Sequence, residues 1–195
     1  EGKSIIDCDV LLGDWSVVYF YPKDFTFICP TEIADMDTII GEADVIGISG
    51  DNEYCKLAWK EQNDAIRNIQ HILAADCGLY LANELGIVDN ENGVPFRATY
   101  IVDPDGIVQH VSVNALDTGR NANEVLRTLQ ALKAGGLTGC SWQPGDEYST
   151  RASNYTPTTP LAAAASCPAC ASCRGLSACA ECGAPGQSFR HSSGL

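Results

Sequence analysis

Residues 19–32 read YFYPKDFTFICPTE, and this stretch decides the fold because it joins a buried strand to the start of a helix. Residues 17–21 are β-branched and aromatic, which predicts a strand, and Pro22 ends it because proline lacks a backbone donor. Pro30 suits the first position of a helix, since its φ is fixed and its missing N–H would have no partner there. The pattern therefore predicts that Cys29 lies at a helix N-terminus.

That position favours a reactive thiol at Cys29. Unpaired N–H groups and the positive end of the helix dipole stabilise an anion at a helix N-terminus. The thiolate is the nucleophilic form of cysteine. The sequence thus predicts a nucleophile at this junction between strand and helix.

Strand and helix signals alternate along the chain. The strand patterns after the first cover residues 45–49, 96–102 and 107–113, and helical stretches follow Pro30 and Asp51 and span residues 121–134. This order predicts an α/β layer fold.

The last two strands are expected to form a hairpin, because Asp103-Pro-Asp-Gly106 between two apolar runs is a turn sequence. The final helix has an apolar face at helical spacing, formed by Val125, Leu126, Leu129 and Leu132. Asn121 or Asn123 can cap its start, and Gly135-Gly136 is expected to stop it.

Residues 19–32 closely resemble the active-site signature of the peroxiredoxins, in particular the typical two-cysteine group that includes the bacterial alkyl hydroperoxide reductase C proteins. Further blocks recur in family order, namely VIGISGD (45–51), LAW (57–59), FRATYIVDPDG (96–106) and GRNANEVL (119–126). The resemblance extends over residues 13–147. It implies a thioredoxin-like fold with a central mixed sheet flanked by helices.

The resemblance also implies roles for single residues. Cys29 would be the peroxidatic cysteine, which attacks a hydroperoxide and becomes a sulfenic acid. Thr26 would hold the peroxide through its hydroxyl, and Pro22 would cover the thiolate. Arg97 would stabilise the thiolate and hydrogen-bond the peroxide oxygens. Taken alone, Thr26 would more often be a loop or capping residue and Arg97 a surface charge, but the joint pattern favours the catalytic interpretation.

Two more residues of the resembled network are Glu32 and Arg120. In the family these positions form ion pairs that orient the catalytic arginine, as a reactive group needs supporting contacts to hold its geometry.

A second thiol must resolve the sulfenic acid, and Cys140 lies in TGCSWQPGD (138–146), which resembles the resolving-cysteine region. Only Ser141 separates this cysteine from Trp142, where the usual pattern has three residues. The resemblance implies a catalytic disulfide between Cys29 and Cys140 of two subunits, in a homodimer that assembles into a larger ring. A thioredoxin-like or dedicated disulfide reductase would return the electrons, and no cofactor is required.

The implied function is a thiol-dependent peroxidase that reduces hydrogen peroxide and alkyl hydroperoxides, an antioxidant activity in cell redox homeostasis. The resemblance leaves two alternative functions open. One is an oligomeric holdase chaperone. The other is a redox sensor that passes its disulfide to a client protein, which a stable mixed disulfide would reveal.

Composition is that of a soluble globular protein, with 45% apolar and 19% charged residues in a chain of 195. The formal net charge is −13 and no basic patch interleaved with aromatic residues occurs, which argues against nucleic acid as a partner. No apolar run has the roughly 20 residues that span a bilayer, and the N-terminus is not like a signal peptide. We therefore expect a cytoplasmic protein without a membrane partner.

We expect residues 1–150 to form the peroxiredoxin-like domain, with the family's N-terminal strands truncated, and residues 151–195 to form a low-complexity tail rich in Ala, Ser and Cys. The tail's cysteines, in C-x2-C spacings, are compatible with disorder, accessory redox thiols or a metal site, and we assign no metal ligands there; they are Cys167, Cys170, Cys173, Cys179 and Cys182. Cys8, Cys55 and Cys77 are predicted to be small buried structural residues.

Overall fold

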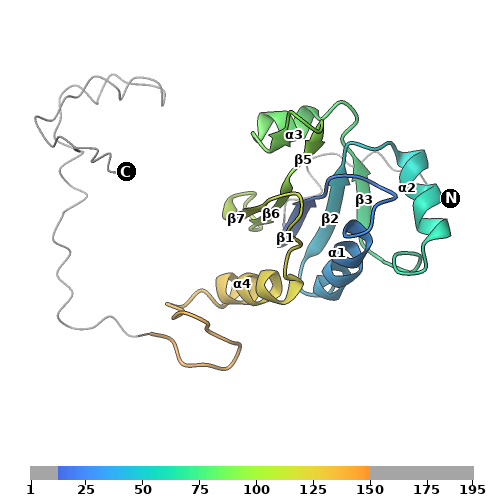
Figure 1. The fold of residues 1–195 in the computed structure, drawn as a ribbon. Coiled ribbons are helices and arrows are strands. Elements are labelled where there is room, and N and C mark those ends of the chain that lie inside the picture. Colours follow the sequence, from blue (N-terminus) through green and yellow to red (C-terminus); the bar gives the residue numbers. More distant parts are fainter. Residues whose placement is uncertain (1–12, 150–195) are drawn as a thin grey trace, which may run out of the picture. The chain divides into compact units, whose positions relative to one another are not determined.

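The computed structural model describes residues 13–149, and the elements below belong to that range (Figure 1). The described residues form seven strands and four α-helices, with one 3₁₀ helix, η2, between the first helix and the second strand. Their bounds are β1 Ser16–Phe20, α1 Cys29–Met36, η2 Asp37–Ile39, β2 Asp44–Ser49, α2 Glu53–Gln62, β3 Ile72–Ala75, α3 Tyr80–Glu84, β4 Val88–Asp89, β5 Val94–Pro95, β6 Arg97–Val102, β7 Val108–Asn114 and α4 Ala122–Ala134. Strands and helices alternate as far as α3, and β4 to β7 then follow one another before α4.

The main sheet is mixed and has five strands in the order β3-β2-β1-β6-β7. Strands β1, β2 and β3 run parallel, whereas β6 is antiparallel to both β1 and β7. A separate two-stranded sheet pairs β4 with β5. The α/β architecture predicted from the alternation of signals is confirmed.

Side chains of β1 alternate between two cores, as the period of two in a strand requires. Val17 and Tyr19 belong to the core that also includes Trp59 of α2 and Leu129 of α4. Val18 and Phe20 face the other side, in the smaller core that includes Ala82 of α3. Helices α1, α2 and α4 therefore cover one face of the sheet and α3 covers the other (Figure 1).

The four predicted strands lie within one residue of the observed ones at each end. The turn after β6 is a hairpin as predicted: the side chain of Asp103 accepts from the backbone N–H groups of Asp105 and Ile107, and Gly106 has a φ of 79°. The patterns did not indicate β3, α3, β4 or β5. These elements are short, and β3 lacks alternation between buried and exposed residues.

The final helix also follows its prediction. Asn121 caps it by accepting from the backbone N–H of Glu124, and Gly135 ends it with a φ of 67°. Val125 and Leu129 are buried on the predicted apolar face. Cys8, the tail cysteines and the proposed boundary at residue 150 lie outside the described residues.

Candidate active site

Cys29 is the first residue of α1, at the junction that follows β1, and only 1% of it is exposed. Pro30 therefore occupies the second helical position, one later than predicted. Ile28 precedes the helix and no side chain caps it. The first turn forms because the carbonyl of Ile28 accepts from the backbone N–H groups of Thr31 and Glu32. The predicted placement of the thiol at a helix N-terminus is confirmed.

Arg97, the first residue of β6, holds its guanidinium against this thiol. Its Nη1 donates to Cys29 Sγ at 3.4 Å and also to Glu32 Oε2. Its Nε donates to the carbonyl of Leu116 at 2.8 Å. Because the guanidinium is planar and bonded on two sides, its orientation toward the sulfur is fixed.

Arg120 completes the group from the loop before α4. Its backbone N–H and its Nε both donate to Glu32 Oε1 at 2.9 Å. Its Nη1 donates to the carbonyl of Ala98 and to Thr99 Oγ1, each at 3.2 Å, and its Nη2 donates to the carbonyl of Phe20. Glu32 thus joins two arginines that come from distant parts of the chain.

This cluster, made of Cys29, Glu32, Arg97 and Arg120, is buried. The side chains of the two arginines are 5% and 4% exposed, and that of Glu32 is 2% exposed. Two guanidinium groups and one carboxylate leave an excess of one positive charge beside the sulfur. In a medium of low dielectric constant, a nearby anion is then favoured.

Pro22 and Thr26 lie in the loop between β1 and α1. The side chain of Thr26 is half-buried, and its hydroxyl donates to the carbonyl of Lys23 at 2.9 Å. Within residues 13–149, no recorded hydrogen bond joins Thr26 to Cys29. The neighbouring Phe25 has a φ of 55°, a left-handed conformation that is strained for an aromatic residue.

A second buried cluster anchors this loop, and the sequence patterns did not indicate it. Lys56 of α2 is 3% exposed, and its Nζ donates to Ser49 Oγ at 2.6 Å, to Tyr21 OH at 2.9 Å and to Asp24 Oδ1 at 3.4 Å. Burial lowers the pKa of Lys56, and the Asp24 carboxylate opposes that shift. Burial and the same carboxylate raise the pKa of Tyr21. One sequence signal could have indicated this cluster. Lys56 lies three residues before Trp59, so both side chains are on the same face of α2, and Trp59 is buried.

The backbone of the loop is tied to this cluster, because Asp24 N–H donates to Asp51 Oδ2 at 2.8 Å. Donor atoms of Asp24, Asp51 and Cys55 lie within 4.8 Å of one another, which makes them the candidate metal ligands among the described residues. Lys56 already supplies the compensating positive charge to Asp24. We therefore assign no metal there.

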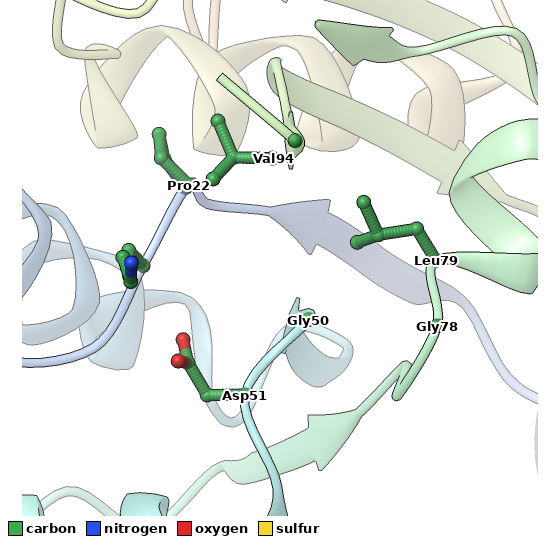
Figure 2. Close-up of a pocket in the computed structure, with 8 residues that line it drawn as sticks. Pro22, Gly50, Asp51, Gly78, Leu79 and Val94 are labelled. Atoms are coloured by element: carbon green, nitrogen blue, oxygen red, sulfur yellow. The ribbon is translucent and has the colours of Figure 1, made fainter. Parts of the chain in front are cut away.

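Pro22 also lines a pocket of about 300 Å³ (Figure 2). Asp51, Leu79 and Val94 are among its lining residues, whereas Cys29, Thr26 and Arg97 are not. The pocket is therefore separate from the thiol, and no substrate is assigned to it.

Comparison with known proteins shows the family of the chain. Residues 1–111 match the sequence model of the AhpC/TSA family. The chain belongs to this family. It is 42% identical over 139 residues to alkyl hydroperoxide reductase C of Mycolicibacterium smegmatis, a match that covers 69% of this chain and 71% of that protein. The chain is thus a peroxiredoxin, an oxidoreductase that reduces peroxide with a thiol, as the resemblance implied.

Solved structures support the fold of this peroxiredoxin. Mycobacterium tuberculosis AhpC matches with a TM-score of 0.64 and 38% identity, over 71% of this chain and 80% of that chain. Reduced Plasmodium vivax 2-Cys peroxiredoxin matches with a TM-score of 0.68 and 33% identity, over 73% of this chain and 80% of that chain. The predicted thioredoxin-like fold is confirmed.

Cys140 of this peroxiredoxin is exposed, in the segment that follows α4. The neighbouring Trp142 is buried, stacks on Tyr148 with ring centres 6.2 Å apart, and its carbonyl accepts from Arg127 Nη1 at 3.2 Å. Cys140 lines a cavity of about 410 Å³, whose other lining residues come from α4 and from the segment that follows it. No hydrogen bond recorded for residues 13–149 connects Cys140 with Cys29.

The prediction that Cys55 and Cys77 are buried is wrong for Cys77, which is exposed, and only partly right for Cys55, which is half-buried. Burial raises the pKa of Cys55, and the carboxylates of Asp24 and Asp51 raise it further. The Cys55 thiol is therefore a poor nucleophile near neutral pH. Position in the chain did not indicate these exposures, because cysteine tolerates both environments.

Proposed function

We propose that Cys29 is the peroxidatic nucleophile of a two-cysteine peroxidase that reduces hydrogen peroxide and alkyl hydroperoxides. The observation that carries the proposal is the 3.4 Å contact between Arg97 Nη1 and Cys29 Sγ inside a buried cluster with one positive charge in excess. A Cys29 thiolate makes this cluster neutral, which supports the reactive form of the sulfur.

In the first step the Cys29 thiolate attacks the terminal oxygen of a hydroperoxide. An S–O bond forms and the O–O bond breaks, so that the sulfur is oxidised by two electrons to the sulfenic acid. The leaving oxygen takes a proton and departs as water or an alcohol. Arg97 donates to the developing charge on the oxygens, and its fixed orientation means that little reorganisation is needed as the bond breaks.

Thr26 and Pro22 complete this proposed site. The Thr26 hydroxyl donates its hydrogen bond to the Lys23 carbonyl. Its oxygen lone pairs can therefore accept a hydrogen bond from the peroxide O–H. Pro22 offers no N–H to the site and shields the sulfur from solvent. Glu32 and Arg120 act indirectly, since they hold the Arg97 guanidinium in place.

Cys140 is proposed to resolve the sulfenic acid. Its thiol attacks the sulfenic sulfur, water leaves, and a disulfide forms between the two cysteines. Its exposure at the surface supports a reaction with Cys29 of a second subunit in a homodimer, the unit of a larger ring. A thioredoxin-like or dedicated disulfide reductase then returns two electrons and restores both thiols.

A cytoplasmic location fits this cycle, because reduced thiols and disulfide reductases are found there. The helices that the structure describes include none with the length and apolar character needed to cross a membrane.

The test treats the reduced full chain, and its Cys29→Ser and Cys140→Ser variants, with one equivalent of hydrogen peroxide. Free thiols are then blocked and disulfides mapped by mass spectrometry. We expect an interchain crosslink between Cys29 and Cys140 that is absent from both variants. A Cys29 thiol that survives peroxide would refute the catalytic assignment, and a crosslink from Cys29 to a tail cysteine would refute the role of Cys140 alone.

A further inference from the structure

Three hydrogen-bonded polar side chains, those of Asp37, His71 and Tyr19, lie beside the cluster of Cys29 and have no part in the mechanism above; the Asp37 side chain is 24% exposed. The Tyr19 hydroxyl lies 2.7 Å from His71 Nε2, and His71 Nδ1 lies 2.7 Å from Asp37 Oδ1. Tyr19 is fully buried and His71 is 6% exposed. We call these residues the Asp37–His71–Tyr19 relay.

The direction of the hydrogen bonds in the relay follows from its chemistry. Asp37 Oδ1 also accepts from the backbone N–H groups of Gln70 and His71, at 2.9 and 3.1 Å. A carboxylate can only accept, so His71 carries its proton on Nδ1 and its Nε2 must accept. The Tyr19 hydroxyl is therefore the donor to His71.

Charge states agree with this direction. Burial lowers the pKa of His71, against the opposing effect of Asp37, which keeps the imidazole neutral near neutral pH. Burial alone would raise the pKa of Asp37, but the hydrogen bonds from His71 and the backbone outweigh it and lower that pKa. Burial also raises the pKa of Tyr19, so the phenol keeps its proton.

The other end of the relay meets the catalytic cluster. The guanidinium carbon of Arg120 lies 4.9 Å from the centre of the Tyr19 ring, within the range of a cation–π contact. Arg120 donates twice to Glu32, and Glu32 accepts from Arg97, which contacts the sulfur of Cys29. The Tyr19 ring thus contacts the arginine network through Arg120.

Gly47 makes this arrangement possible. It pairs with Tyr19 across β1 and β2, and a Cβ at this position would lie 2.4 Å from the Tyr19 hydroxyl oxygen. Any side chain here would block the path of the phenol toward β3. The phenol therefore crosses β2 over a glycine and reaches His71 just before β3 begins.

We propose that Tyr19, held by His71 and Asp37, is a positioning residue that keeps Arg120 and, through Glu32, Arg97 in the geometry for peroxide reduction. Donation to His71 shifts electron density onto the phenol and strengthens its attraction for the guanidinium. The inference rests on the proposed function of Cys29.

Protonation of His71 has a defined consequence in this arrangement. An imidazolium has N–H groups on both nitrogens, so the Tyr19 oxygen must accept instead of donate, and the ring loses electron density. The charged and titratable groups that face His71 are Asp37 from η2, Tyr19 from β1 and Lys60 from α2. Lys60 is held by the carbonyl of Ile69 at 2.8 Å.

The test measures the second-order rate constant for oxidation of Cys29 by hydrogen peroxide, by stopped flow between pH 5.5 and 8. It compares the full chain with Tyr19→Phe, His71→Leu and His71→Gln. Tyr19→Phe keeps the ring and removes the donor, and we expect a rate constant about three- to tenfold lower at pH 7.5, the scale of one lost hydrogen bond. The rate constant of His71→Leu should be lowered to the same extent as that of Tyr19→Phe.

His71→Gln is the conservative variant, because its amide can donate to Asp37 and accept from Tyr19. We expect it to retain the wild-type rate constant within about twofold and to lose any inflection that His71 contributes to the pH profile. Tyr100→Phe is the control, since Tyr100 packs in the core on the other face of the sheet. Its rate constant should equal that of the wild type.

Two results would overturn the inference. One is a folded Tyr19→Phe protein that reacts as fast as the wild type, and the other is a His71→Gln protein as slow as Tyr19→Phe. If His71→Leu does not fold, Tyr19→Phe still tests the inference, because this substitution preserves the shape of the core. Failure of the proposed function is seen separately, as a wild-type protein whose Cys29 does not react with peroxide.

Discussion

Replacement of Glu32 by Gln tests whether one carboxylate organises the site. Glu32 Oε1 accepts from the backbone N–H and the Nε of Arg120, and Oε2 accepts from Arg97 Nη1. Glutamine can keep the first set of bonds with its oxygen. Its NH₂ group would then face Arg97 Nη1, and two donors would meet where a donor and an acceptor meet now.

The expected cost follows from burial. Both arginine side chains and Glu32 are at most 5% exposed, so solvent cannot screen the two guanidinium charges once the carboxylate is gone. Removal of one partner from a buried ion pair costs about 3–5 kcal/mol. Because glutamine keeps part of the hydrogen bonding, we expect the free energy of unfolding to fall by about 3 kcal/mol. We expect the rate constant with peroxide to fall about 10- to 100-fold, as Arg97 loses its orientation.

Urea unfolding of the reduced protein gives the first quantity and stopped-flow oxidation of Cys29 the second. Glu42→Gln is the matched control, because Glu42 pairs with Lys133 at 2.9 Å with side chains 41% and 32% exposed. Exposed pairs contribute at most about 1 kcal/mol, so this variant should keep the wild-type rate constant and nearly all of the stability. A Glu32→Gln protein that equals the Glu42→Gln protein in both measurements would refute the reasoning.

Three further predictions concern single contacts. Arg97→Lys should lower the peroxide rate constant about a hundredfold in stopped flow, because an ammonium cannot contact Cys29, Glu32 and the Leu116 carbonyl together; an unchanged rate would contradict it. Lys56→Met should lower the free energy of unfolding by about 3 kcal/mol in urea titrations by leaving the buried Asp24 carboxylate unpaired, and adding Asp24→Asn should recover part of it. The pKa of His71 is lower in the folded state than its ordinary value of 6.5, so the unfolded chain takes up the proton first. The free energy of unfolding should therefore fall as pH drops below about 6.5, and His71→Gln should flatten that decline in unfolding experiments at pH 7.5 and 5.5.

Of the cluster of Cys29, Glu32, Arg97 and Arg120, only the position of Cys29 could be predicted from local sequence. Residues 19–32 contain a strand, a proline stop and a helix start within a few positions, and each signal depends on its immediate neighbours. Cys29 was therefore placed correctly at the start of α1. Arg97, Glu32 and Arg120 were placed together by resemblance alone, since no local pattern relates residues separated by 65 or 88 positions.

The buried Lys56 cluster shows where sequence patterns fail. A lysine on an amphipathic helix is usually exposed, and only the approach of Tyr21, Ser49 and Asp24 from other elements makes its burial tolerable. The exposure of Cys77 has the same origin, because the packing of neighbouring elements decides whether a small apolar side chain is covered.

By itself, the sequence determined the order of the main strands and helices, the hairpin at Asp103 and the position of Cys29 at a helix start, because these depend on periodicity, proline and glycine over a few residues. The tertiary structure decided which charges surround the sulfur and how the Tyr19 ring passes over Gly47 to reach His71 and support Arg120. Such contacts join residues far apart in the chain, and their energies depend on burial, which exists only after the sheet and helices have packed.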